Sequence, residues 1–221
     1  GNSGSAGTPD LLSSLSATDL ENRSLYSAEE LQVACNWVRD PTSTPERALS
    51  GARLIANAFA SDSTHYGLSR ADIARVVTHK DSGCLPSLLN FVQQGQIKLY
   101  VEIPPEELVY GDEIGTGTAG SVVRAMWNGK PVAVKKFKGV ELGDFLKELS
   151  IMSIVQHPNL VECYGGCSRN KDTMYIVQEL MDCNISDALR MRAINMDLGL
   201  KLRIALEVAK GVSYLHTHCN L

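Results

Sequence analysis

Two short stretches decide the fold of this chain: Ile114-Gly115-Thr116-Gly117-Thr118-Ala119-Gly120-Ser121-Val122 and, shortly after it, Val132-Ala133-Val134-Lys135. Glycines in the first stretch have no Cβ atom, so backbone N–H groups can approach phosphate oxygens and the loop can open and close. The residues after Gly120 are β-branched or large and apolar, and Asn128-Gly129 supplies a tight hairpin turn. The pattern therefore predicts strand, loop, strand, turn and strand.

This order of elements excludes two other nucleotide-binding sites. A dinucleotide-binding site needs its third glycine to open a helix and an acidic residue about twenty positions further on, whereas Gly120 opens a predicted strand. A P-loop closes on Gly-Lys-Ser/Thr, which this loop lacks. For the glycine loop alone, a merely permissive β-hairpin is an equally good interpretation.

Lys135 favours a phosphate-binding interpretation over a solvated edge charge, the usual state of a strand lysine. It closes an apolar strand in which Ala133 is small enough to admit a flat ring, which Val122 and Ala133 would cover. A compact ammonium in such a cleft needs an anionic partner, and Glu148 is the candidate. Glu148 borders an inward apolar stripe at helical spacing, which is formed by Phe145, Leu149, Met152 and Val155.

We therefore predict that Lys135 and Glu148 face each other within ion-pair reach, which is about 4 Å. Glu141 is the competing acid, but it lies at the helix entrance, where the helix dipole explains a carboxylate. The helix is expected to end at His157-Pro158-Asn159. A strand is then expected over residues 160–167, a polar turn over 169–172 and an apolar strand over 174–177.

In this order of features the chain resembles the protein kinase family, in particular its tyrosine-kinase-like and Raf-like branch, over about residues 108–221. The resemblance implies that Gln178 is the gatekeeper of the adenine pocket and that the Glu179 carbonyl and the Met181 amide bind adenine; ordinary packing is the alternative for Met181. The residues that it implies in ATP binding are Ile114, Gly115, Thr116, Gly117, Thr118, Ala119, Gly120, Val122, Ala133, Lys135, Glu148, Gln178, Glu179 and Met181.

The resemblance also implies that the catalytic motifs are missing. The catalytic aspartate of the His-Arg-Asp motif, the metal-binding asparagine and the Asp-Phe-Gly motif would all follow Leu221, so no catalytic residue and no Mg²⁺ ligand is expected in the chain. Because the chain also begins at Gly1, we expect an inactive fragment of an ATP- and Mg²⁺-dependent protein kinase. Its intact form would phosphorylate protein Ser or Thr in preference to Tyr.

A protein that acts by binding is the alternative, either a pseudokinase or an armadillo-like scaffold. The residue that would decide is the aspartate of the His-Arg-Asp motif, which sequencing beyond Leu221 would reveal. After the hinge we expect a short helix over residues 184–190. The helix expected over 198–215 is apolar on nearly every side, as is typical of a helix enclosed by other elements.

Composition agrees with a cytoplasmic signalling protein. The 221 residues allow one or two domains, and a net charge of −4 gives no patch for nucleic acid or membrane. No apolar run reaches membrane-spanning length. The expected partners are therefore ATP and protein substrates or signalling proteins. Free thiols are expected for Cys35, Cys84, Cys163, Cys167, Cys183 and Cys219.

The N-terminal half predicts a separate helical region. Residues 1–9 form a Gly/Ser-rich, disordered-looking lead. Residues 10–100 contain two imperfect copies of a helical unit of about forty residues, which resemble degenerate armadillo repeats; a plain helical bundle is an equally good interpretation. Helix starts are predicted at Ser27 with Glu30, at Thr44-Pro45 and at Ser69.

Residues 101–107 would form a stiff, proline-containing joint to a kinase domain over 108–221. The predicted fold class is α+β. It consists of an all-helical N-terminal region, a kinase N-lobe with a five-stranded antiparallel sheet and one helix, and a truncated helical C-lobe. Through the helical region the protein would contact its signalling partners.

Overall fold

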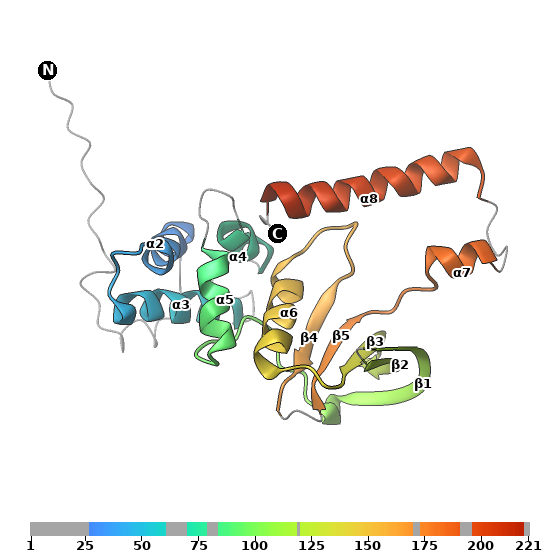
Figure 1. Ribbon diagram of the computed structural model, residues 1–221, viewed down its shortest axis with the longest axis horizontal. Helices are drawn as coiled ribbons and strands as arrows, with labels where there is room; N and C mark the ends of the chain where they lie inside the picture. Colours follow the sequence, from blue (N-terminus) through green and yellow to red (C-terminus); the bar gives the residue numbers. More distant parts are fainter. Residues whose placement is uncertain are drawn as a thin grey trace, which may run out of the picture.

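A computed structural model describes residues 27–60, 70–78, 84–118, 120–169, 173–190 and 196–218. Within these residues a group of helices precedes a five-stranded antiparallel sheet, and further helices follow it (Figure 1). The predicted α+β class is therefore confirmed. The lead over residues 1–9 and the helix start at Ser69 lie outside the described residues.

The N-terminal region is helical, as predicted. Its helices are α2 (Ala28–Arg39), α3 (Pro45–Ala60), α4 (Arg70–Thr78) and α5 (Leu85–Gln93). The Ser27 backbone N–H donates to Glu30 Oε2 over 2.9 Å, and the Glu30 N–H donates to Ser27 Oγ over 3.2 Å, which forms the predicted capping box. Pro45 is the first residue of α3, and the Thr44 hydroxyl accepts from the Arg47 N–H. The likeness to armadillo repeats stays a prediction.

The sheet has the order β1-β2-β3-β5-β4, with every neighbouring pair antiparallel. Its strands are β1 (Leu108–Gly117), β2 (Gly120–Trp127), β3 (Lys130–Phe137), β4 (Cys163–Cys167) and β5 (Tyr175–Glu179). The predicted turn between β2 and β3 is present, since Asn128 and Gly129 have φ values of 49° and 77°. Positive φ at both positions is typical of the turn that matches the twist of a hairpin.

Three helices accompany or follow the sheet: α6 (Leu142–Ile154), α7 (Ile185–Arg190) and α8 (Leu198–His218). All three agree with the predicted positions. The last two strands differ from prediction, because β4 begins at Cys163 rather than at residue 160 and β5 continues to Glu179. A register shift between Cys163 and Gly165 interrupts the β4 ladder, and the sequence pattern alone does not reveal such a bulge.

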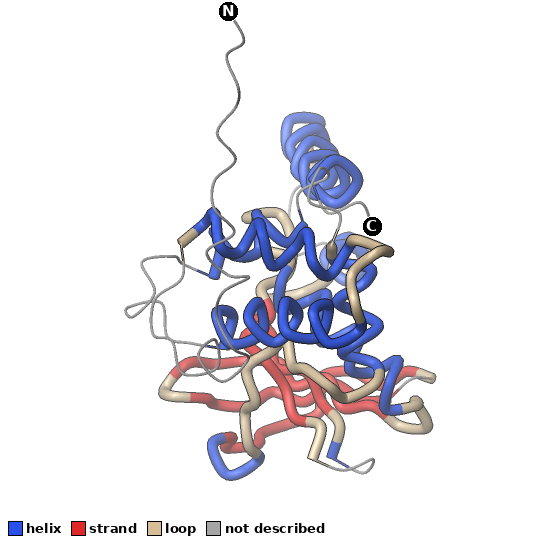
Figure 2. Tube along the Cα trace, turned by 90° about the vertical axis from the view of Figure 1, so that its left-hand side faces the viewer, coloured by secondary structure: helices blue, strands red, loops and turns tan. Residues whose placement is uncertain are grey.

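Each face of the sheet has its own apolar core. On one face Phe137 and Ile176 pack with Phe145 and Leu149 of α6, and this cluster continues into the N-terminal helices. Figure 2 shows the helices stacked on this side of the sheet. On the other face a smaller cluster consists of Ile103, Leu108, Ala125, Val132, Val134, Cys167, Tyr175 and Val177. The short 3-10 helix η1 (Pro105–Glu107) leads into β1.

Candidate nucleotide-binding site

An ion pair joins the sheet to α6. Lys135 Nζ, on β3, lies 2.8 Å from Glu148 Oε1 on α6. The predicted meeting of these two side chains is therefore confirmed. Both are half-buried, with 35% and 41% of their side-chain surface exposed. Glu141, the competing acid, is the N-cap residue of α6 and does not take this position.

The strand register places the predicted adenine-covering residues beside the ion pair. Val122 of β2 lies opposite Lys135 of β3, and Ala133 lies two positions before it on the same strand. Gln178 of β5 lies opposite Ala133. Directly opposed and alternate strand residues share a face, so these four side chains are on the α6 side of the sheet. The same face carries Phe137, whose ring centroid is 5.1 Å from that of Phe145.

The glycine loop is the tip of the β1–β2 hairpin. Gly117 pairs with Gly120 across the tip, and Ala119 lies outside the described residues. Gly120 has a φ of 141°, and a Cβ atom there would collide with the carbonyl oxygen of Lys136. Gly117 has no atom within 4 Å of its Cβ position, and Gly115 has Val122 Cβ at 4.0 Å. The loop therefore needs glycine at 120 for its backbone and offers open space at 115 and 117.

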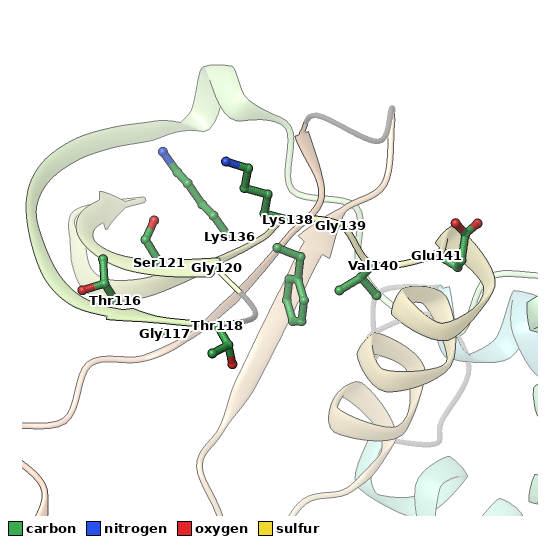
Figure 3. A pocket seen from close by; sticks show the side chains of 11 residues that line it. Thr116, Gly117, Thr118, Gly120, Ser121, Lys136, Lys138, Gly139, Val140 and Glu141 are labelled. Carbon is green, nitrogen blue, oxygen red and sulfur yellow. The ribbon is translucent and has the colours of Figure 1, made fainter.

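A hollow of about 670 Å³ lies between this loop and the start of α6. The loop residues Thr116 and Ser121 contribute to its wall, together with Lys136 and Lys138 from the end of β3 (Figure 3). Lys135 and Glu148 do not line it, so the hollow does not contain the ion pair. Sequence reasoning missed Lys136 and Lys138, although the run Lys135-Lys136-Phe137-Lys138 was the available signal.

The predicted hinge follows β5. Gln178 and Glu179 are half-buried, while Met181 is 56% exposed. Glu179 is held by Glu162, because its backbone N–H donates to the Glu162 carbonyl over 2.9 Å and its carboxylate accepts from the Glu162 N–H over 2.9 Å. These two hydrogen bonds fix the backbone where it leaves the sheet after β5. Sequence reasoning missed this link, since the link depends on where the β4 bulge lies.

A neutral thiol lies beside Gln178. Cys163 of β4 lies opposite Gln178, and its Sγ is 3.7 Å from the Ser153 hydroxyl of α6. Burial raises the pKa of the Cys163 thiol, so the thiol stays protonated near neutral pH.

The residues that the structure describes contain no group of three or more His, Cys, Asp and Glu side chains placed to hold a metal ion. Among the same residues, no helix combines the length and the apolar character needed to cross a bilayer. The arrangement therefore offers an apolar face, a paired cation and a glycine loop to a ligand, but no metal cage of its own.

Comparisons with known proteins support the same interpretation. Residues 108–220 match the family model of protein tyrosine and serine/threonine kinases. A probable serine/threonine-protein kinase of Dictyostelium discoideum is 35% identical over 130 residues, which is 56% of this chain and 14% of that protein. The tyrosine-protein kinase Btk of Drosophila melanogaster is 34% identical over 122 residues, which is 53% of this chain and 16% of that protein.

A dual specificity protein kinase of Dictyostelium discoideum, shkE, is 36% identical over 129 residues, or 54% of this chain and 18% of that protein. The matches thus span less than a fifth of the length of each of these relatives. The family match begins at Leu108, the first residue of β1, and it includes the glycine loop, Lys135 and Glu148. The chain belongs to the protein tyrosine and serine/threonine kinase family.

Proposed function

We propose that this lobe binds ATP between the glycine loop, Lys135 and residues 178–181, and that the protein to which it belongs transfers phosphate from ATP to hydroxyl groups of proteins. The observation that carries the proposal is the 2.8 Å ion pair between Lys135 and Glu148. In this family a strand lysine contacts the α- and β-phosphates of ATP and a helix glutamate pairs with it.

The exposure of the ion pair supports a role in binding. Pairs exposed to this degree contribute about 1 kcal/mol or less to stability, because water screens them. The ion pair between Lys135 and Glu148 therefore contributes little to the free energy of folding. Their value would lie in holding an ammonium group towards phosphate oxygens, where a compact point charge is effective.

The remaining residues would enclose the nucleotide. Ile114, Val122 and Ala133 would provide apolar contacts to the adenine, with Gln178 at the rear. The Glu179 carbonyl and the Met181 N–H would hydrogen-bond its edge. Thr116 and Thr118, with Ala119 and the glycines 115, 117 and 120, would cover the phosphates. ATP itself supplies the phosphoryl group, and Mg²⁺ would arrive bound to its phosphates.

The relatives named above include kinases of the serine/threonine, tyrosine and dual specificity types. We propose Ser or Thr as the preferred acceptor, with protein substrates and signalling proteins as partners and the cytoplasm as the site of action. The helical N-terminal region would contribute contacts to those partners.

Titration of the purified chain with ATP tests the nucleotide site, with chemical shifts in two-dimensional NMR as the readout. Weak binding is expected, and Lys135→Met should weaken it about tenfold or more. The matched control is Lys147→Met, which removes the same charge from an exposed position of α6 and should change the dissociation constant less than about twofold. Equal losses in the two variants would reject Lys135 as a phosphate ligand.

Magnesium provides a second test of the same site. Since the kinase resemblance assigns the Mg²⁺ ligands to motifs other than those present here, the affinity for ATP should change little when Mg²⁺ is added. Micromolar binding that rises sharply with Mg²⁺ would contradict this placement of the ligands.

A further inference from the structure

Helix α6 carries Glu148 and is enclosed on two sides. The sheet covers one side of it through Phe137, Met174 and Ile176, and the N-terminal helices cover the other. Helices α4 and α5 both contact α6, and Figure 1 shows α5 beside it. One continuous apolar core joins the N-terminal helices to α6. It includes Leu88, Leu89 and Val92 of α5 together with Phe145, Leu146 and Leu149 of α6.

The contact between α5 and α6 is close at the first turn of α6. A Cβ atom at Gly143 would lie 3.6 Å from the carbonyl oxygen of Gln93, the last residue of α5, and 3.9 Å from Gln93 Cβ. Phe145 and Leu149 have no exposed surface, and they flank Glu148 along the helix. A rotation that moved Glu148 away from Lys135 would uncover these apolar side chains.

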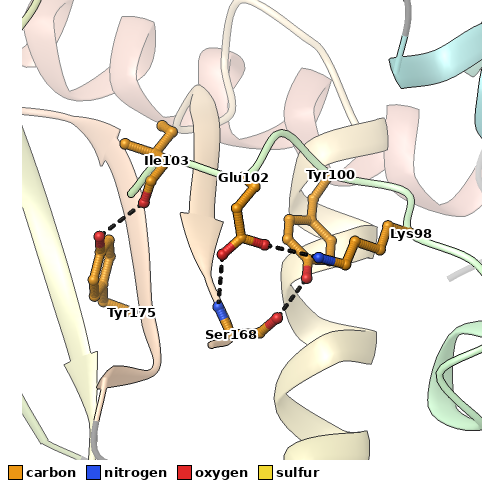
Figure 4. A network of polar contacts seen from close by, with 6 residues as sticks. All are labelled: Lys98, Tyr100, Glu102, Ile103, Ser168 and Tyr175. Atoms are coloured by element: carbon orange, nitrogen blue, oxygen red, sulfur yellow. Dashed lines mark hydrogen bonds and ion pairs between the residues drawn. The ribbon is translucent and has the colours of Figure 1, made fainter. Parts of the chain in front are cut away.

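The connecting segment, residues 94–107, joins α5 to β1 and is itself bonded to the sheet. The Ile103 N–H donates to the Gly166 carbonyl over 2.8 Å, and the Gly166 N–H donates to the Val101 carbonyl over 3.0 Å. The Tyr175 hydroxyl donates to the Ile103 carbonyl over 2.8 Å. Figure 4 shows this bond beside those of the same segment to Ser168.

Two side chains of the connecting segment reach Ser168. The Tyr100 and Ser168 hydroxyls are 2.6 Å apart, and the Ser168 N–H donates to the Glu102 carboxylate, which also pairs with Lys98 over 3.1 Å. These contacts leave the helical region little freedom to move relative to β4. The helices and the sheet therefore hold α6 between two surfaces that are fixed to each other.

We propose that helices α4 and α5 position Glu148, so that the N-terminal helical region is a structural part of the nucleotide site. The inference rests on the proposed ATP-binding function and identifies Leu88, Leu89, Val92 and Gly143 as positioning residues. The ion pair alone is too exposed to hold α6 in place. Apolar packing by the N-terminal helices supplies the missing restraint.

The test places a bulky side chain between α5 and α6. Gly143→Phe fills the space next to Gln93, whereas the control Lys147→Phe adds the same ring at an exposed position of α6. Carbodiimide, which couples a carboxylate to an amine in contact with it, reports the Lys135–Glu148 distance without nucleotide. The yield of the Lys135–Glu148 cross-link, measured by peptide mass spectrometry, should fall about threefold or more in Gly143→Phe and stay unchanged in Lys147→Phe.

Nucleotide affinity gives the second readout. Gly143→Phe should weaken ATP binding about fivefold in the natural sequence but less than about twofold in a Glu148→Gln background, because the effect passes through Glu148. Equal weakening in both backgrounds would show general damage to the fold and would overturn the inference. If Gly143→Phe does not fold, Val92→Ala, a smaller change in the same core, replaces it in the same cycle.

The two readouts separate the inference from the proposed function. The positioning role is overturned if the cross-link yield is unchanged in Gly143→Phe, or if the natural sequence gives no Lys135–Glu148 cross-link. Either result holds whether or not the chain binds ATP. Absence of ATP binding by the natural sequence, together with a cross-link that Gly143→Phe abolishes, rejects the proposed function and supports the positioning of Glu148 by α5.

Discussion

At the scale of single residues, Gly120 is a position at which backbone geometry alone requires glycine. Its φ of 141° lies in a region that other residues rarely adopt, and a Cβ atom would meet the backbone of Lys136 and Phe137. Gly120→Ala should therefore lower the free energy of unfolding by about 2 kcal/mol or more. Gly117→Ala, which meets no atom within 4 Å, should change it by less than about 0.5 kcal/mol. Urea unfolding measures both, and similar losses would contradict the strained position of Gly120.

The buried thiols of Cys35 and Cys84 should make the stability of the fold depend on pH. Cys84 and Cys35 are both buried, with their sulfur atoms 3.0 Å apart. The hydrogen bond from Cys84 to Cys35, together with burial, raises the pKa of the Cys84 thiol. An unfolded thiol loses its proton near pH 8.5, whereas the folded protein retains it at that pH. Stability is thus fully present below pH 8.5 and declines as the pH rises further.

The difference in unfolding free energy between pH 7.5 and pH 9.5 should reach about 1 kcal/mol from this group. Urea unfolding at the two pH values measures it in the natural sequence and in Cys84→Ala. A smaller decline in Cys84→Ala is expected, because that variant has no thiol to titrate at position 84. An unchanged decline would assign the pH dependence to other groups.

Sequence reasoning identified some residues of the candidate site better than others. The Lys135–Glu148 pair was predictable, because a strand lysine and a carboxylate beside an apolar helical stripe follow from local periodicity. The link between Glu162 and Glu179 was not, because it depends on the register of two strands far apart in the chain. The roles of the ATP-binding residues stay predictions until a ligand is tested.

At the scale of elements, the predictable strands are those with local signals at their ends. Asn128-Gly129 marks the turn between β2 and β3, and both strands were placed from it. The start of β4 could not be placed, since the bulge before Gly165 leaves no mark in the hydrophobic pattern. The parallel bridge between Glu102 and Gly166, which brings the connecting segment onto the sheet, is likewise not predicted by any local sequence signal.

Helix α8 is the element for which the burial expected from the sequence differs most from the burial in the structure. It was predicted to need neighbours on nearly every side, and its apolar side chains are in fact exposed, with Leu198 at 71%, Leu202 at 61% and Leu206 at 55%. Tyr214 of α8 stacks on His157 with ring centroids 4.9 Å apart, and Gly211 lies next to Asn159. The other apolar residues form a surface of the kind that promotes association.

We therefore expect the purified chain to self-associate and to be poorly soluble. Leu202→Gln with Leu206→Gln should reduce the association without lowering the unfolding midpoint, because these side chains contribute burial energy, about 1.5–3 kcal/mol each, only when something covers them. Light scattering over a range of protein concentrations measures the effect. Lys201→Gln with Lys210→Gln, at exposed polar positions of the same helix, is the control and should not reduce association.

At the scale of the whole molecule, the helical region and the sheet act as one unit. The sequence indicated two regions joined at residues 101–107, and composition alone could suggest nothing about their mutual packing. The core that runs from α2 through α5 into α6 is a long-range feature, and no periodicity in either half predicts it. Domain boundaries proposed from sequence therefore need not be boundaries of cooperative folding.

This continuity predicts a single unfolding transition, and the two tryptophans of the chain allow it to be tested. Trp37 is buried in α2, and Trp127 lies in β2, stacked on Tyr164 with centroids 5.8 Å apart. In Trp127→Phe the fluorescence reports the helices, and in Trp37→Phe it reports the sheet. Within each variant, the urea midpoint from fluorescence should coincide with that from circular dichroism, since a shared core couples the two regions. A fluorescence transition of Trp37 that precedes the loss of helix and sheet signal would mean that the helical region unfolds independently, and it would also remove the restraint on α6 from which the position of Glu148 was inferred.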